Sequence, residues 1–335
     1  MTQDLLIGIS GGGVVDTDRD SPDVDSIFRR VKAAGVFDYI ERSPPPLELD
    51  AFRRAVDRHG IPLMSGSFFY MLGRDEPLME WHLRIAASFG GLALNMQIMV
   101  RDAEGNRVTD RRLAETFLWI SEIGDRLGVM PCFEIHVNMW SERFTRVIAV
   151  GNLVERRGGT FNITFDHSHV IFKIGNEGEL DVEDNRADIA AGKLELDPYK
   201  PGNINDLLIA RNWVSHAHAR SAVPGNPVNT QARHPDGRFG RGIQYPFIQP
   251  APGEYHAAWD AALLEPWKEV LRRMMRHRLR TPSSRLRQIT VEMIPGIDYG
   301  AGAKYSIFEH SVAIARWLRT TWSEIKAGSE IKAGG

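Results

Sequence analysis

Residues 131–137 read Pro-Cys-Phe-Glu-Ile-His-Val, a short apolar run that carries an acid and a histidine at Glu134 and His136. Ionisable side chains are costly to bury, so their position near the end of an apolar strand calls for a partner or a function. Three further runs have the same form, and they end in Asp166 with His167 and His169, in His216 with His218 and Arg220, and in Glu292. This repetition predicts one shared site, most simply a divalent cation with its substrate.

Short apolar runs of this kind alternate along the chain with longer segments of helical periodicity, which predicts βα units around a parallel sheet. We expect eight strands, at Leu5–Ser10, Phe37–Glu41, Pro62–Ser67, Leu92–Met96, Pro131–Val137, Asn162–Asp166, Trp213–His218 and Ile289–Met293. The expected helices are Asp23–Ala34, Glu48–His59, Leu78–Ser88, Asp110–Gly128, Arg143–Arg157, Asn205–Asn212, Tyr255–Arg278 and Ile307–Ile325. Eight such units predict an α/β fold, the closed (β/α)₈ TIM barrel.

We expect a single barrel domain over residues 1–322, with long loops after the sixth and seventh strands at 167–205 and 221–253. Barrel enzymes build their pockets from the loops at the carboxyl ends of the strands, where both of these would lie. Residues 323–328 repeat as 329–334, and we interpret 323–335 as a disordered C-terminal tail.

The composition of the chain excludes several functional classes. Its 335 residues carry a formal net charge of −2, which leaves no overall field to recruit nucleic acid or anionic lipid. A single cysteine, Cys132, excludes an internal disulfide and a multi-cysteine metal site. No apolar stretch approaches the roughly 18 residues of a membrane span, and the N-terminal region does not have the form of a signal peptide. We therefore expect a soluble cytoplasmic protein that binds neither nucleic acid nor membrane.

The period of a strand places the polar residues of each cluster on one face. Glu134 and His136 share a parity, as do His216, His218 and Arg220, so each set would point into the barrel. Two glutamates, an aspartate and a histidine suit Mn²⁺, Mg²⁺, Co²⁺ or Zn²⁺, and three carboxylates favour the harder ions over zinc. Such an ion can hold a carbonyl and its neighbouring hydroxyl and stabilise an enediolate when the intervening proton leaves.

The order Glu, Asp-x-x-His, His-x-His-x-Arg, Glu after the fifth to eighth strands resembles the xylose isomerase-like superfamily of TIM barrels, which includes sugar phosphate isomerases, epimerases and endonuclease IV-type enzymes. Residues 37–41, Phe-Asp-Tyr-Ile-Glu, are also similar to that superfamily's second strand. The endonucleases need further histidines after the earlier strands and an Asp-x-His after the seventh. Here those strands end in Ser67 and Asn95, so DNA repair is not expected.

The resemblance implies one divalent metal ion, for which we expect Mn²⁺ first, and a set of ligands. The implied ligands are Glu134, Asp166, His218 and Glu292. It also implies that Glu134 and Glu292 are the catalytic acid and base. His169 matches a histidine that contacts substrate or a metal in relatives, and we expect it, like Arg220, to contact substrate here. We also predict that His216 contacts substrate. The alternative is that His216 is a buried structural residue.

Two residues distinguish this chain from simple epimerases. His136 follows Glu134 by two positions, and either a general base or a partner that supports the metal site fits it equally well. Arg241 lies in the long segment 234–247, which is larger than a small ketose needs. This segment either closes over a bulky glycoside, with Arg241 as a substrate contact, or contacts another subunit of a homo-oligomer or a partner protein.

We therefore expect a metal-dependent isomerase or epimerase that removes a proton next to a sugar carbonyl. The alternative enzyme is a lyase that expels a leaving group after the same deprotonation, as in the C-glycoside deglycosidase branch of the superfamily. A third hypothesis is a barrel that binds a ligand without turnover. The complete set of four predicted ligands argues against that third hypothesis.

Overall fold

The computed structural model describes residues 4–225 and 229–333 of the chain. Eight parallel strands close into a barrel in the order of the sequence, and β8 pairs with β1. The strands are β1 (Leu6–Ser10), β2 (Tyr39–Glu41), β3 (Leu63–Tyr70), β4 (Ala93–Ile98), β5 (Met130–Ile135), β6 (Ile163–Asp166), β7 (Val214–Ala219) and β8 (Gln288–Val291). The predicted (β/α)₈ barrel and its eight strands are confirmed.

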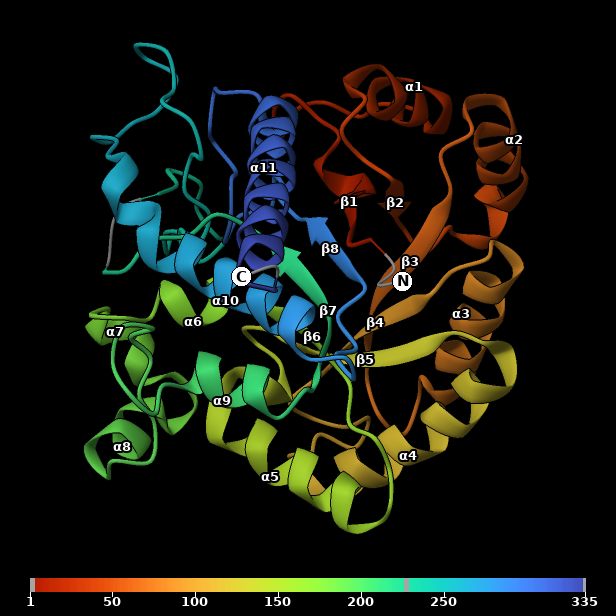
Figure 1. The fold of residues 1–335 in the computed structure, drawn as a ribbon, viewed down its shortest axis with the longest axis vertical. Coiled ribbons are helices and arrows are strands. Elements are labelled where there is room, and N and C mark those ends of the chain that lie inside the picture. Colours follow the sequence, from red (N-terminus) through yellow and green to blue (C-terminus); the bar gives the residue numbers. More distant parts are fainter. Residues whose placement is uncertain (1–3, 226–228, 334–335) are drawn as a thin grey trace.

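Helices surround the strands on the outside of the barrel (Figure 1). They are α1 (Val24–Ala34), α2 (Leu49–His59), α3 (Glu76–Ser88), α4 (Asp110–Leu127), α5 (Phe144–Arg156), α6 (Ser168–Ile171), α7 (Glu177–Leu180), α8 (Asn185–Ala190), α9 (Ile204–Ala210), α10 (Glu265–Arg280) and α11 (Ile307–Ala333). Local signals set several of their ends. Asp23 caps α1 by accepting the Ser26 N–H, and Gly60 ends α2 in the left-handed region, with φ of 65°.

Apolar side chains of the outer barrel wall pack against these helices. Phe133 on β5 meets Phe117 on α4 with ring centroids 5.0 Å apart, and Phe117 also contacts Phe161. Helix α5 approaches the barrel closely at Gly151, where an added Cβ would lie 2.4 Å from the Trp213 ring. This packing leaves the inner face of the barrel for the polar residues of the clusters.

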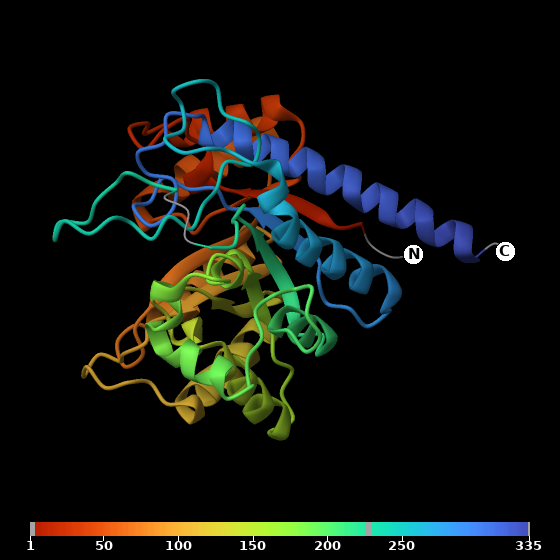
Figure 2. The same ribbon diagram turned by 90° about the vertical axis from the view of Figure 1, so that its left-hand side faces the viewer.

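The two faces of the barrel differ. The N- and C-terminal ends lie on one side, and the long connection after β7 extends on the other (Figure 2). Because β1 begins near the N-terminus, the carboxyl ends of the strands face this connection. The connection after β6 contains α6, α7, α8 and the short 3₁₀ helix Val182–Asp184. Residues 226–228 of the predicted loop after β7 lie outside the described residues.

The predicted helix Tyr255–Arg278 begins ten residues too early, because α10 starts at Glu265. Pro266 occupies its first turn, where a missing backbone N–H costs nothing. The aromatic residues before Glu265 form hydrogen bonds with residues of the loop instead. The Tyr255 hydroxyl donates to Asn229 Oδ1 at 2.8 Å, and the Trp259 indole donates to the Pro246 carbonyl at 2.8 Å.

The chain beyond residue 323 is helical as far as Ala333, where we had expected a disordered tail. Residues 334–335 of that tail lie outside the described residues. The repeated Ser-Glu-Ile-Lys-Ala-Gly segment contains good helix formers, and Lys326 pairs with Asp4 at 2.9 Å. Within residues 4–225 and 229–333, no helix combines the length and apolar character that crossing a membrane requires.

Candidate active site

The four predicted metal ligands converge at the carboxyl end of the barrel. Glu134 lies in β5, Asp166 ends β6, His218 lies in β7, and Glu292 directly follows β8. One ligand atom from each lies within 4.8 Å of the others, and all four side chains are buried. The arrangement follows from the fold, because the ends of neighbouring parallel strands meet at one face of a closed barrel. The group can therefore hold a metal ion.

His218 stands at the centre of the carboxylates. Its Nδ1 atom lies 2.7 Å from Glu292 Oε2 and 3.0 Å from Glu134 Oε1. Burial lowers the pKa of His218, but the charges of Glu292, Glu41 and Glu134 outweigh burial and raise this pKa well above its ordinary value. The protonated His218 ring thus acts as a counter-ion to the surrounding carboxylates. A divalent cation bound among the same carboxylates could take over this role.

Arg220 binds two of the same acids from the end of β7. Its Nη2 donates to Glu292 Oε2 at 2.6 Å, and its Nε donates to Asp166 Oδ2 at 3.2 Å. Burial raises the pKa of Asp166, but the charges of His169 and Arg220 overcome this and hold it well below its usual value. Both acids are therefore ionised, as metal ligands must be.

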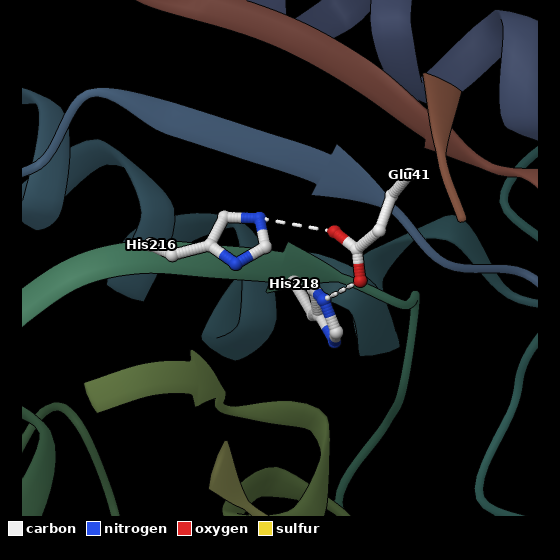
Figure 3. A group of neighbouring side chains, drawn as sticks. All are labelled: Glu41, His216 and His218. Carbon is white, nitrogen blue, oxygen red and sulfur yellow. Dashed lines mark hydrogen bonds and ion pairs between the residues drawn. The ribbon is translucent and has the colours of Figure 1, made fainter. Parts of the chain in front are cut away.

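Glu41, which we did not include in the predicted site, contributes a further buried carboxylate (Figure 3). Its Oε1 lies 3.0 Å from His218 Nε2, and its Oε2 lies 3.2 Å from His216 Nε2. Ser65 and Thr290 also donate to Glu41 Oε2. The match of residues 37–41 to the second-strand motif was the signal that pointed to Glu41. His216 lies behind the ligand group and supports it.

Two amide side chains of β4 fix the carboxylate of Glu134. The Nδ2 of Asn95 donates to Glu134 Oε2 at 2.6 Å, and the Nε2 of Gln97 donates to the same oxygen at 2.5 Å. Both residues are buried. In the sequence these amides had no feature that separates them from ordinary strand residues.

His136 lies just beyond the end of β5 and not within the strand as predicted, yet it still faces the site. Its ring lies 4.4 Å from the ring of His169. Its Nε2 lies 3.0 Å from the hydroxyl of Tyr299, which belongs to the connection after β8. The Tyr299 ring in turn covers Arg220 at 3.9 Å. Burial lowers the pKa of His136 to about 4, so this ring is neutral at pH 7.

Arg241 lies in a separate charged cluster. Its guanidinium donates to Glu142 Oε1 at 2.5 Å and also binds Glu179. The fully buried Lys173 binds the same Glu142 at 2.9 Å. This cluster joins the connections after β5, β6 and β7. None of these contacts places Arg241 against a substrate, so its role in substrate binding stays a prediction.

A cavity of about 740 Å³ opens beside the ligand group. Its polar lining includes Glu41, Gln97, His136, Glu292 and Tyr299. The apolar part of the lining includes Pro44, Pro45, Pro46, Phe68, Phe69, Leu78 and Trp81. The volume lies in the range of about 300–1,000 Å³ that is usual for pockets that enclose small ligands.

No protein-family model matches the sequence, and a search of curated proteins found no match. Solved structures do match. The 3-keto-D-glucoside 4-epimerase YcjR from E. coli has a TM-score of 0.51 at 14% identity, over 95% of this chain and 100% of that one. The probable 3-DHS dehydratase AsbF from Bacillus anthracis has a TM-score of 0.52 at 12% identity, over 92% and 98%.

A xylose isomerase domain protein from Alicyclobacillus acidocaldarius has a TM-score of 0.54 at 12% identity, over 96% of this chain and 99% of that one. Identities this low show a shared fold. They agree with the closed parallel barrel and with the resemblance in the strand-end motifs. The chain therefore has the fold of the xylose isomerase-like TIM barrels.

Proposed function

We propose that this protein is a divalent-metal-dependent sugar isomerase or epimerase that removes a proton next to a carbonyl. One observation carries the proposal: three carboxylates and a histidine from four strand ends meet within 4.8 Å, beside a cavity with room for a sugar. YcjR, a 3-keto-D-glucoside 4-epimerase of the same fold, supports a sugar as the class of substrate.

The residues present fit a divalent ion. Glu134, Asp166, His218 and Glu292 would hold it, with Mn²⁺ as the first expectation, because three carboxylates and one imidazole suit a hard or intermediate dication. When bound, the ion supplies positive charge that stabilises the negative charge developing on the carbonyl oxygen.

The chain's own side chains would orient substrate and move the proton. Glu292 lines the cavity, and the two amides of β4 fix the carboxylate of Glu134 next to it. We assign one of these carboxylates as the base and the other as the acid. Arg220 Nη1 forms no hydrogen bond among the described residues, which leaves it available to a substrate oxygen. The neutral His136 is a further candidate base.

A deuterium-exchange experiment tests this proposal. A panel of ketoses and keto-glucosides is incubated with Mn²⁺-loaded protein in D₂O, and deuterium in intact sugar is measured by mass spectrometry. Glu134→Gln and Glu292→Gln are each expected to lower turnover by about 10²–10⁴-fold, the usual range for a positioned acid or base. Glu80→Gln, an exposed carboxylate change on α3, is the control. Near-normal activity in both site variants would sink the assigned roles.

The apolar wall of the cavity favours a second candidate, a lyase that cleaves a keto-glycoside. Phe68 and Phe69 are 40% and 50% exposed, and a sugar alone gives such rings little to bury. An apolar aglycone would cover them. AsbF, a probable dehydratase of the same fold, carries a name that also implies elimination. Release of free aglycone from a keto-glycoside, rather than deuterium in an intact sugar, distinguishes this reaction.

A further inference from the structure

Helix α3 presents one of its faces to the apolar part of the cavity. The helix lies against β3 (Figure 1). Leu78, Trp81 and His82 are spaced i, i+3 and i+4, so they share one face of α3, and all three line the cavity. Phe68 and Phe69 of β3 line it as well. The imidazole of His82 is therefore a polar group within an apolar surface.

His82 is almost entirely buried, with 4% of its surface exposed. Its ring centroid lies 4.7 Å from that of Phe68 and 5.0 Å from that of Trp81. Burial lowers the pKa of His82 to about 4, so its ring is neutral at pH 7. A neutral imidazole has one donor nitrogen and one acceptor nitrogen, and each needs a partner when it is buried.

Tyr70 determines which nitrogen of His82 carries the hydrogen. The Tyr70 hydroxyl is buried and lies 2.8 Å from His82 Nδ1. Within residues 4–225 and 229–333 this hydroxyl has no other hydrogen-bond partner, so it donates to Nδ1 and the ring hydrogen lies on Nε2. Nε2 points away from Tyr70 and forms no hydrogen bond with the described part of the chain. His82 therefore has a free N–H donor.

We propose that the apolar part of the cavity is a subsite for a flat apolar group with an oxygen acceptor, and that the Nε2–H of His82 binds this oxygen. An aryl ketone or an aryl ether has this chemistry. Its ring would pack on the exposed rings of Phe68 and Phe69. An apolar group without the oxygen would leave a buried donor unpaired, so the subsite discriminates against it.

The subsite adjoins the proposed active site. The ring of Phe69 lies 6.2 Å from the ring of His136, and the same cavity reaches Glu292. A group held in the subsite would therefore be a substituent of a sugar bound at the four predicted metal ligands. In naming this substituent the inference rests on the proposed function, whereas binding of the apolar group by itself does not.

His82 also borders a void of about 10 Å³ on the side of Gly66 and Ala86. Such a void holds about one water molecule. If Nε2 donates only to a water there, His82 is a structural partner of Tyr70 and the subsite has no polar anchor. A test must therefore separate ligand binding from this structural role.

A pair of probes with nearly the same shape makes this separation. Acetophenone carries an oxygen acceptor and isopropylbenzene does not. Their dissociation constants for the full-length protein are measured by ligand-observed NMR, which needs neither metal nor turnover. His82→Met should reduce the preference for acetophenone by roughly 2–10-fold, the net effect of one neutral hydrogen bond, and His82→Gln, which keeps an N–H donor, should retain most of it. His59→Met, which changes an imidazole paired with Asp25 outside the cavity lining, is the control and should keep the wild-type preference.

A second measurement uses the wild type and does not depend on the folding of His82→Met. In protein with ¹⁵N-labelled histidine, the Nε2–H signal of His82, identified by its absence in His82→Gln, should move on addition of acetophenone and stay in place with isopropylbenzene. Equal preference in the wild type and His82→Met, or an Nε2–H signal that neither probe moves, would overturn the subsite. Binding of neither probe would also overturn it. These outcomes leave deuterium exchange into a sugar unaffected, and failure of that exchange would leave probe binding unaffected, so the two proposals fail separately.

Discussion

At the scale of single residues, the proposed site depends on the side chains that orient the predicted ligands as much as on the predicted ligands themselves. Asn95 and Gln97 donate to the same oxygen of Glu134 at 2.6 and 2.5 Å. Partners of this kind fix the direction of a ligand's lone pairs and tune its basicity. Glu134 is therefore held in one orientation before a metal or substrate arrives.

We expect Asn95→Ala to weaken divalent metal binding by about 10–100-fold, the usual effect of removing such a partner. The reason is that Glu134 loses one of its two amide donors. Isothermal titration of metal-free protein with Mn²⁺ measures the change. Asn152→Ala, an exposed amide change on α5, is the matched control and should leave the affinity unaltered. Equal affinities in the two variants would show that Asn95 does not position Glu134.

His310 provides a residue-scale prediction about stability and pH. It is buried near the start of α11, and its Nδ1 accepts the backbone N–H of Phe247 at 3.0 Å. Burial lowers the pKa of His310 to about 4. In the unfolded chain this imidazole is protonated below about pH 6.5, whereas in the folded chain it is protonated only below about pH 4. The free energy of unfolding is therefore highest above pH 6.5 and falls as the pH drops towards 4.

Protonation of His310 should lower the free energy of unfolding by roughly 3 kcal/mol by pH 4, at about 1.4 kcal/mol per pH unit. His310→Asn keeps an acceptor for the Phe247 N–H and cannot be protonated. Urea unfolding at pH 7.5 and pH 4.5 should therefore show a smaller loss of stability on acidification in this variant than in the wild type. An identical loss would mean that other histidines account for the acid sensitivity. His167, whose pKa burial also lowers to about 4, is the first of these.

At the scale of elements, the barrel brings together helices and connections that are distant in sequence. Arg241, in the connection after β7, is held by Glu142 after β5 and by Glu179 after β6. Asp298, after β8, accepts the Arg241 backbone N–H at 2.9 Å and the His234 side chain at 2.9 Å. Tyr299 follows directly and contacts His136. These contacts hold the four connections together above the site.

Helix α5 fits the barrel through a glycine. An alanine at Gly151 would place its Cβ 2.4 Å from the buried Trp213 ring, so the helix or the ring would have to move. We expect Gly151→Ala to destabilise the fold by about 1–3 kcal/mol, measured by thermal or urea unfolding. Gly178→Ala, where an added Cβ meets nothing within 4 Å, is the matched control and should be neutral or slightly stabilising. Equal stability of both variants would contradict the tight packing of α5.

At the scale of the whole molecule, metal binding should be linked to folding. The ligands come from β5, β6, β7 and the end of β8, so an ion at the site joins one half of the barrel and binds only the folded chain. Free metal at 100 times its dissociation constant adds about 2.7 kcal/mol of stability. The melting temperature should therefore rise when Mn²⁺ is added to metal-free protein and fall when a chelator is added.

The effect should disappear in His218→Asn, which removes a ligand at the centre of the group, and persist in Glu80→Gln. Differential scanning fluorimetry with and without Mn²⁺ measures both. A melting temperature that Mn²⁺ leaves unchanged in the wild type would contradict a metal site that spans these strands.

Most of the fold was predictable, because its signals are local. The alternation of short apolar runs with helical periodicity located all eight strands, and glycines and capping residues placed ends such as Gly60. The errors occurred where distant contacts override local preference. Residues 255–260 have a helical pattern but form a loop that packs against segments such as the one that contains Asn229, and Ala261–Leu264 form a short 3₁₀ helix.

The sequence by itself determined the barrel and the meeting of the four predicted ligands at the strand ends, since strand period and chain order decide which residues reach the carboxyl face. Only the tertiary structure decided which other residues meet there. Glu41 reaches His218 across 177 positions of sequence, and Tyr299 reaches His136 across 163. Closure of the barrel creates these contacts, because it brings β2 and the connection after β8 to the same centre as β5 and β7, and no local pattern encodes that approach.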